Sequence, residues 1–220
     1  MPTKSPHRDA LRLLYLLVEG SSPLDDRSRL PVVRIFKGEA RLHALDFWMR
    51  NPDYLAEELM DEFDATGDTR FLRLTREIFD AEEPDIRRFP MIRYRFGAYE
   101  RLDDALAILR SRDLVRFSGK KSGDRVMETD FEITESAVHL AAQIVCEFPE
   151  LGWYAERAAL VSELAGDRGG AALKERQYER AAYAETKLGG IIPPVTDLAK
   201  ARLDQLLGSL PLDSLVGTHG

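Results

Sequence analysis

The sequence predicts a mainly α-helical protein with one small β-hairpin. Apolar residues recur at helical spacing along most of the 220 residues. Between residues 99 and 147 the pattern changes from helix to strand, through a polar turn, to a second strand and back to helix. This order is that of the second half of a winged-helix domain. Such domains usually place a helix and a hairpin against a partner rather than perform catalysis.

Within this region, the apolar stripe Leu102, Ala105, Leu106 and Leu109 predicts the first helix. The predicted strands are Leu114–Phe117 and Phe131–Ile133, with a polar turn over residues 118–125 between them. Thr134 begins the second helix. Further helices and strands are predicted along the N-terminal part of the chain. Helices are expected over residues 8–19, 38–50, about 52–63 and about 71–78, and strands at 32–36 and 91–96.

The helix over residues 8–19 is apolar on nearly every side, so it is either buried all round or paired with another chain. In the second case Leu11, Leu14 and Leu17 would form a docking surface. The corner Asn51–Pro52 ends one helix and begins the next, because proline suits the first turn of a helix.

Residues 1–150 are expected to form a winged-helix domain with a helical insertion, and residues 151–220 a C-terminal helical region. The last residues, 214–220, are expected to be disordered. The final helix carries an apolar stripe that either lies in the groove of a partner or packs on its own C-terminal helices. This stripe includes Leu203, Leu206, Leu207 and Leu210.

The composition favours a cytoplasmic protein. Hydrophobic residues make up 44% of the chain, and the single cysteine, Cys146, cannot form an internal disulfide and is expected in the core. No apolar run approaches the roughly 18 residues that a membrane span needs. The 31 basic and 38 acidic residues give a formal charge of −7. This charge argues against wholesale sequence-independent DNA binding, which depends on many cationic contacts to phosphates.

Two basic segments are candidate binding sites for DNA or a protein partner. The hairpin segment either contacts phosphates or is a solvated turn whose charges prevent edge-to-edge pairing. It consists of Arg116, Lys120, Lys121 and Arg125. In the second segment, Arg93, Tyr94 and Arg95, the arginines are expected to face outward from a strand. Three roles are open to arginines at that position. They bind single-stranded nucleic acid, they anchor an acidic partner surface, or they are solvated.

The helix that would enter a DNA groove begins with Glu100 and contains the pair Asp103–Asp104. Adjacent carboxylates repel phosphate, and the helix offers no Asn or Gln to read adenine. Sequence-specific DNA reading is therefore disfavoured.

Enzyme motifs are weak. Gly119–Lys120 lacks the other residues of a phosphate-binding loop, and the four histidines are scattered. The segment Glu185–Thr186–Lys187 matches a loose nuclease element but lies in a helical pattern. We therefore predict no catalytic residue, no metal and no cofactor.

Two segments together carry a family resemblance. Residues 41–55, Arg-Leu-His-Ala-Leu-Asp-Phe-Trp-Met-Arg-Asn-Pro-Asp-Tyr-Leu, resemble a Leu-Asp-Phe-Leu-Leu-Arg-Tyr-Pro-x-x-Leu stretch, and residues 92–99 resemble an Arg-Tyr-Arg-Tyr-Gly segment. Both stretches are typical of the middle components of bacterial ABC-three-component systems. The strand-to-helix joint at 131–135 fits the same plan, and the resemblance covers about residues 11–180. Trp48 and Asn51 depart from the family pattern, which leaves the subfamily open.

The resemblance implies a non-catalytic adaptor in an antiphage (antiviral) defence complex of the Lamassu type. Its expected partners are an SMC-like or Rad50-like ATPase and an effector such as a nuclease, with contact to DNA within the complex left open. The alternative is a free-standing, dimeric winged-helix transcription regulator.

Overall fold

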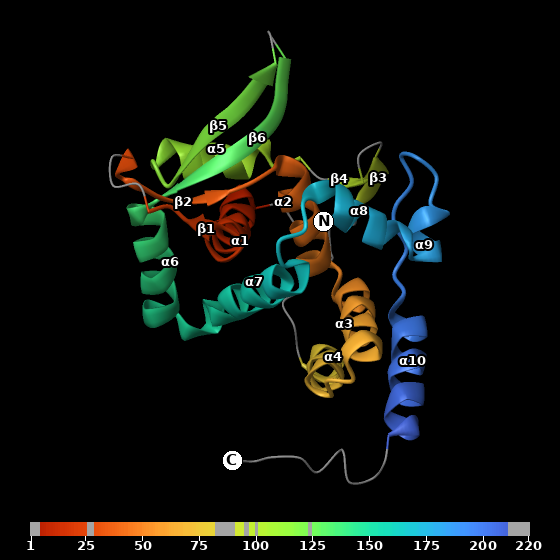
Figure 1. Ribbon diagram of the computed structural model, residues 1–220. Helices are drawn as coiled ribbons and strands as arrows, with labels where there is room; N and C mark the ends of the chain where they lie inside the picture. Colours follow the sequence, from red (N-terminus) through yellow and green to blue (C-terminus); the bar gives the residue numbers. More distant parts are fainter. Residues whose placement is uncertain are drawn as a thin grey trace. The chain divides into compact units, whose positions relative to one another are not determined.

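The computed structural model describes residues 5–25, 29–81, 91–94, 97–99, 101–122 and 125–210 (Figure 1). Side chains are described for these residues except at 97, 99, 120–122 and 125–127. The protein is mainly helical with a small antiparallel sheet, which confirms the predicted fold class at that level. The chain forms two compact units. We call Met1–Met49 with Pro90–Ile192 the sheet unit, and Arg50–Phe89 with Pro193–Gly220 the three-helix unit.

The sheet unit contains most of the secondary structure. In chain order its elements are α1 (Pro6–Glu19), β1 (Ser22–Pro23), β2 (Val32–Phe36), α2 (Glu39–Arg50, whose last residue belongs to the other unit), β3 (Ile92–Tyr94), β4 (Gly97–Tyr99), α5 (Asp103–Ser111), β5 (Val115–Ser122), β6 (Arg125–Thr134), α6 (Glu135–Glu147), the 3-10 turn η3 (Pro149–Leu151), α7 (Gly152–Ala165), α8 (Gly170–Tyr178) and α9 (Ala181–Ala184).

The main sheet has the strand order β1-β2-β6-β5 with antiparallel neighbours. Val115 and Phe117 of β5 lie opposite Ile133 and Phe131 of β6, so these four side chains share one face. Phe131 contacts Phe36 of β2 edge to face and is buried, as are Val115 and Ile133. This face forms one wall of the core.

The hairpin is longer than the sequence predicts. Residues 118–122 belong to β5, and β6 begins at Arg125, so the expected turn over 118–125 is wrong for most of its length (Figure 1). Ser118 pairs with Asp130, and Gly119 pairs with Thr129. Pattern analysis misses this part of β5 because its sequence does not alternate between apolar and polar residues. The backbone hydrogen bonds of a strand pair form without an apolar face.

Helix α1 is buried on nearly all sides, which is one of its two predicted alternatives. Leu13, Leu16 and Leu17 have no exposed surface, and Leu14 is 2% exposed. The helix packs against α5, α6, α7, β2 and β6. Tyr15 donates a hydrogen bond to the Ala141 carbonyl of α6 at 3.1 Å. Leu14 and Leu17 therefore form core rather than a docking surface.

A buried ion pair fixes α1 to α2. Arg12 donates from Nε to Asp46 at 2.6 Å and from Nη1 to Asp9 at 2.6 Å. The Arg12 and Asp46 side chains are 2% and 0% exposed. Burial disfavours the charge of Arg12, but the two carboxylates outweigh this effect and raise its pKa.

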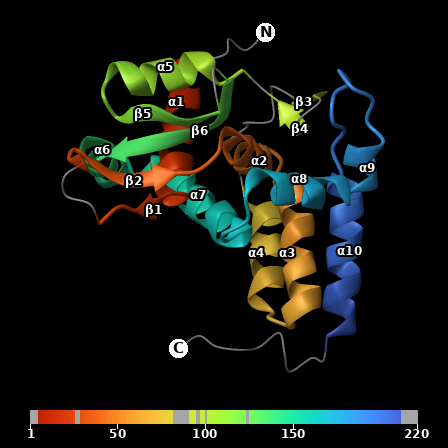
Figure 2. The same ribbon diagram turned by 45° about the horizontal axis from the view of Figure 1, so that its top comes forward.

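The three-helix unit contains α3 (Pro52–Thr66), α4 (Arg70–Asp80) and α10 (Thr196–Ser209), which lie side by side in Figure 2. Asp53 joins α3 to the start of α10, because its carboxylate accepts from the Val195 N–H at 2.6 Å and from the Thr196 hydroxyl at 3.2 Å. The core of the unit consists of Met60, Leu72, Ala199 and Leu203.

Arg202 binds α10 to α3 through three carboxylates. It contacts Glu57 at 2.7 Å, Asp61 at 2.8 Å and Asp64 at 2.7 Å. Burial opposes the charge of Arg202, but the hydrogen bonds that it donates to the three carboxylates prevail and raise its pKa. This network supplements a small apolar core.

The expected division near residue 150 does not coincide with these compact units. Helix α7 packs against α1 and α6, so residues after 150 are part of the sheet unit. Helix α10 packs against α3 and α4 and belongs to the three-helix unit. The expected disordered segment, 214–220, lies outside the described residues. Among the described ranges, no helix is long and apolar enough to cross a membrane.

We expect Asp46→Asn to lower the free energy of unfolding by about 3–5 kcal/mol, because it leaves Arg12 buried without its main carboxylate. Replacing both partners (Arg12→Met with Asp46→Leu) should recover much of this loss. Urea denaturation followed by tryptophan fluorescence measures the effect, since both tryptophans, Trp48 and Trp153, lie in the sheet unit.

The matched control is Asp113→Asn, which breaks the exposed ion pair between Asp113 and Arg116. Asparagine also tolerates the positive φ of 52° at this position. An equal loss of stability in both single variants would contradict the role assigned to the buried pair.

Candidate interaction surfaces

Arg93 points into the protein, so the expectation that it faces outward is wrong. Its Nη1 donates to the Ala184 carbonyl at 2.6 Å and to the Thr186 carbonyl. The guanidinium lies 5.0 Å from the centre of the Tyr178 ring. Arg93 therefore binds β3 to the segment that follows α9, and its contacts are structural.

The face of β3 opposite Arg93 is apolar and exposed. Ile92 is 44% exposed and Tyr94 is 53% exposed. An antiparallel bridge places Ile191, which is 60% exposed, directly beside Ile92. The hydrogen bonds from Arg93 N to Gly190 O and from Ile192 N to Met91 O flank this pair, so the two isoleucine side chains lie close together. We call Ile92, Tyr94 and Ile191 the β3 outer face.

The other side of the same small sheet belongs to the core. Met91, Ala98 and Ile192 are 2%, 5% and 6% exposed. The expected alternation is confirmed over the described residues 91–94, but the buried and exposed faces are the reverse of those expected. Isoleucine and tyrosine on a strand normally indicate the core face, and the carbonyls that hold Arg93 inside belong to residues 91 and 93 positions away in the chain.

At the hairpin, the one described basic candidate side chain is already paired. Arg116 donates two hydrogen bonds to the Asp113 carboxylate, at 2.7 and 2.8 Å. These bonds lower the pKa of Asp113. The backbones of Lys120, Lys121 and Arg125 lie in β5 and β6, but their side chains are outside the described part, as is all of Arg95.

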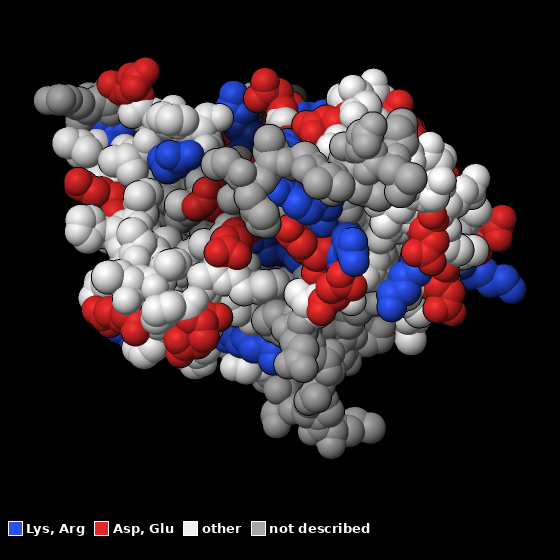
Figure 3. Space-filling view, turned by 90° about the horizontal axis from the view of Figure 1, so that it is seen from below, with Lys and Arg blue, Asp and Glu red and all other residues white. Residues whose placement is uncertain are grey.

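Helix α5 presents an acidic first turn to solvent. Asp103 and Asp104 are exposed, whereas Ala105, Leu106 and Leu109 face the core. The partial positive charge at the N-terminal end of a helix stabilises these carboxylates, which is a structural reason for their position. Figure 3 shows acidic and basic side chains interspersed on the face that it presents. The described charges on α5 do not favour a DNA backbone.

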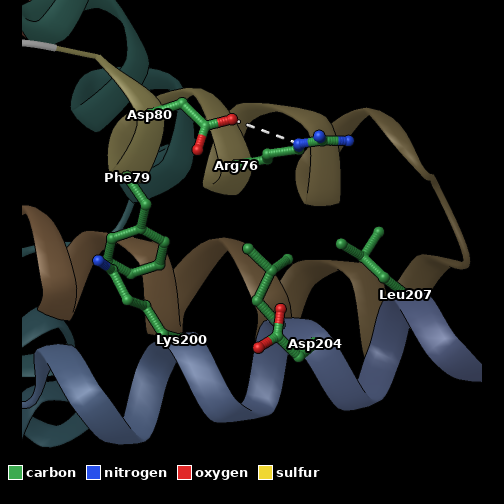
Figure 4. A pocket seen from close by; sticks show the side chains of 7 residues that line it. Arg76, Phe79, Asp80, Lys200, Asp204 and Leu207 are labelled. Carbon is green, nitrogen blue, oxygen red and sulfur yellow. Dashed lines mark hydrogen bonds and ion pairs between the residues drawn. The ribbon is translucent and has the colours of Figure 1, made fainter.

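The apolar stripe of α10 packs partly within its own unit. Leu203 is 5% exposed and belongs to the core, and Leu206, Leu207 and Leu210 pack against that core but remain partly exposed. Leu207 also lines a groove of ≈ 440 Å³ between α4 and α10. We call this the α4–α10 groove (Figure 4). Its other lining residues are Arg76, Phe79, Asp80, Lys200, Leu203 and Asp204.

The weak nuclease element Glu185–Thr186–Lys187 contributes structural contacts, since its Thr186 carbonyl accepts from Arg93. Glu185 follows the end of α9, and no group of three His, Cys, Asp or Glu in the described ranges could hold a metal ion. Cys146 is exposed on α6, so its expected place in the core is wrong.

Comparisons of the chain with protein-family models, with curated proteins and with solved structures gave no match. The family resemblance of residues 41–55 and 92–99 therefore stays a prediction. The sequence pointed to Tyr94 in the β3 outer face and to Leu203 and Leu207 in the α4–α10 groove, but not to Ile92, Ile191 or Phe79.

We expect Arg93→Gln to lower the free energy of unfolding of the sheet unit by about 1–3 kcal/mol, because two partly buried carbonyls lose a charged donor. Ile191→Ser, on the exposed side of the same small sheet, should change it by less than about 0.5 kcal/mol. Tryptophan fluorescence during urea unfolding compares the two variants. If Ile191→Ser proved the more damaging, the assignment of inner and outer faces would be reversed.

Proposed function

We propose that this protein is a non-catalytic winged-helix adaptor that binds other proteins through the β3 outer face. The order α1, β2, α2, α5, β5, β6 and the pairing of β2 with β6 support the winged-helix assignment. In a winged helix, the strand after the first helix pairs with the returning strand of the wing. Residues 51–99 would then be an insertion between the second and third helices.

The exposed apolar surface of β3 is the observation that carries the adaptor proposal. An antiparallel sheet with one buried face usually has polar residues on the other. Here the exposed face is apolar, with Ile92, Tyr94 and Ile191 all exposed and Ile92 directly beside Ile191. Contiguous exposed apolar residues mark binding surfaces, and tyrosine is enriched in protein interfaces.

The acidic start of α5 favours a protein partner over DNA. A winged helix that reads DNA inserts its third helix into the major groove. Asp103 and Asp104 would then meet phosphates, and Arg116 of β5 is held by Asp113. The free-standing, DNA-binding transcription regulator is therefore the second candidate.

The identity of the partners comes from the family resemblance. It implies an SMC-like or Rad50-like ATPase and an effector encoded nearby, in an antiphage complex. The segment that carries most of the resemblance is buried, since Leu42, Phe47 and Trp48 have no exposed surface. This buried segment supports a fold shared with the family. We assign the contacts with the ATPase to exposed residues such as those of β3.

Co-expression with the neighbouring genes tests the proposal. The tagged wild-type chain should co-purify with an ATPase and a second protein. Ile92→Asp with Ile191→Asp should reduce the recovered ATPase at least tenfold, because two carboxylates would have to be desolvated in the interface. The masses of the eluted proteins, read by mass spectrometry, give the result.

Leu198→Asp is the control, because Leu198 is 69% exposed but lies on α10 in the three-helix unit. Circular dichroism should show that all variants are folded. Equal ATPase recovery with both variants would exclude the β3 outer face as the binding surface. A chain that elutes alone as a dimer and binds DNA would support the regulator.

A further inference from the structure

A second binding surface lies in the three-helix unit, where α4 and α10 leave an open groove between them. Phe79 from α4 and Leu203 and Leu207 from α10 give it an apolar floor. Phe79 and Leu207 belong to the partly buried residues that surround the core of the unit. The groove therefore extends the core to the surface of the unit.

The rim of the groove carries charges of both signs on both walls. Arg76 and Asp80 lie one helical turn apart on α4, and Lys200 and Asp204 lie one turn apart on α10 (Figure 4). Arg76 pairs with Asp80 along its own helix at 3.3 Å, and no ion pair among these four described residues crosses the groove. Each wall thus offers one cation and one anion to an occupant.

The two walls run in opposite directions. The Nζ atom of Lys200, near the start of α10, lies 5.5 Å from the centre of the ring of Phe79, near the end of α4. The span from Lys200 to Leu207 is about two helical turns, or about 10 Å. Two antiparallel helices with an apolar seam between them form the usual receptor for a third, amphipathic helix.

We propose that the α4–α10 groove binds an amphipathic helix supplied by a partner protein. Its apolar seam would contact Phe79 and Leu207, and acidic and basic side chains one turn apart would flank the seam on both sides. The mixed charges of the rim favour such a helix over nucleic acid or an anionic lipid surface. Those two ligands would require cations without neighbouring carboxylates. The groove is separate from the β3 outer face, and this inference does not depend on the proposed function.

A designed helical peptide serves as the probe. It has leucines at positions i, i+3 and i+7, with glutamate and lysine placed to oppose the rim charges, and a fluorophore at one end. We expect saturable binding to the full-length chain in fluorescence anisotropy. Arg76→Glu with Lys200→Glu should weaken binding at least tenfold, and a peptide with its flanking charges exchanged should restore binding to that variant.

The matched control is Arg73→Glu, which alters an exposed residue of α4 that does not line the groove. This variant should bind the original peptide as the wild type does. Absence of saturable binding, or an equal loss in the control, would overturn the proposal. So would failure of the charge-exchanged peptide to rescue the double variant.

Two further measurements test whether the occupant of the groove is a partner protein. If sedimentation velocity showed a dimer that Leu207→Asp converts to a monomer, a second copy would be the occupant and the proposal would be wrong. It would also be wrong if a variant ending at Leu210 bound the peptide at least tenfold more tightly than the full chain, because residues 211–220 would then compete for the groove. Equal binding and a monomeric chain support it.

Discussion

The burial of α1 is the constraint on which the rest of the sheet unit depends. A helix of 14 residues whose leucines face several directions needs neighbours on every side, and α5, α6, α7, β2 and β6 supply them. Burying such a helix also buries Arg12, so the fold must provide Asp46 from α2. The apolar pattern of one short segment thus determines how five elements and a buried charge pair are arranged.

The same arrangement fixes the position of the wing. Thr134 ends β6 and caps α6, since its hydroxyl oxygen accepts from the Ala137 N–H at 3.4 Å. It also contacts the carbonyls of Asp113 and Leu114, at 2.9 and 3.1 Å, where α5 leads into β5. A single residue therefore ties together the ends of β6 and α5 and the starts of β5 and α6. Whatever partner meets the hairpin meets a surface that is rigid at its base.

Elements with a regular apolar pattern could be predicted from the sequence. The helices α1 to α6, the strand β2 and the base of the hairpin follow the expected periods, because burial of one face imposes those periods. The outer half of the hairpin could not be predicted, since its sequence over residues 118–125 lacks the apolar alternation of a strand. The two compact units could not be predicted either, because the contact between α10 and α3 depends on Arg202 and Asp53, which resemble ordinary surface charges in sequence.

The candidate sites show why composition alone misplaces a binding surface. In the segment Ile92–Tyr94, the sequence suggested that Arg93 faces outward, and it named Arg93 and Tyr94 as candidate contacts with a partner. The structure holds Arg93 inward with two backbone carbonyls, which accept from Nη1, and with a tyrosine ring beside the guanidinium. Once the inner face is occupied in this way, strand alternation requires Ile92 and Tyr94 to face solvent. An exposed apolar face created by an inward arginine is costly for an isolated chain, and its natural compensation is burial against another protein.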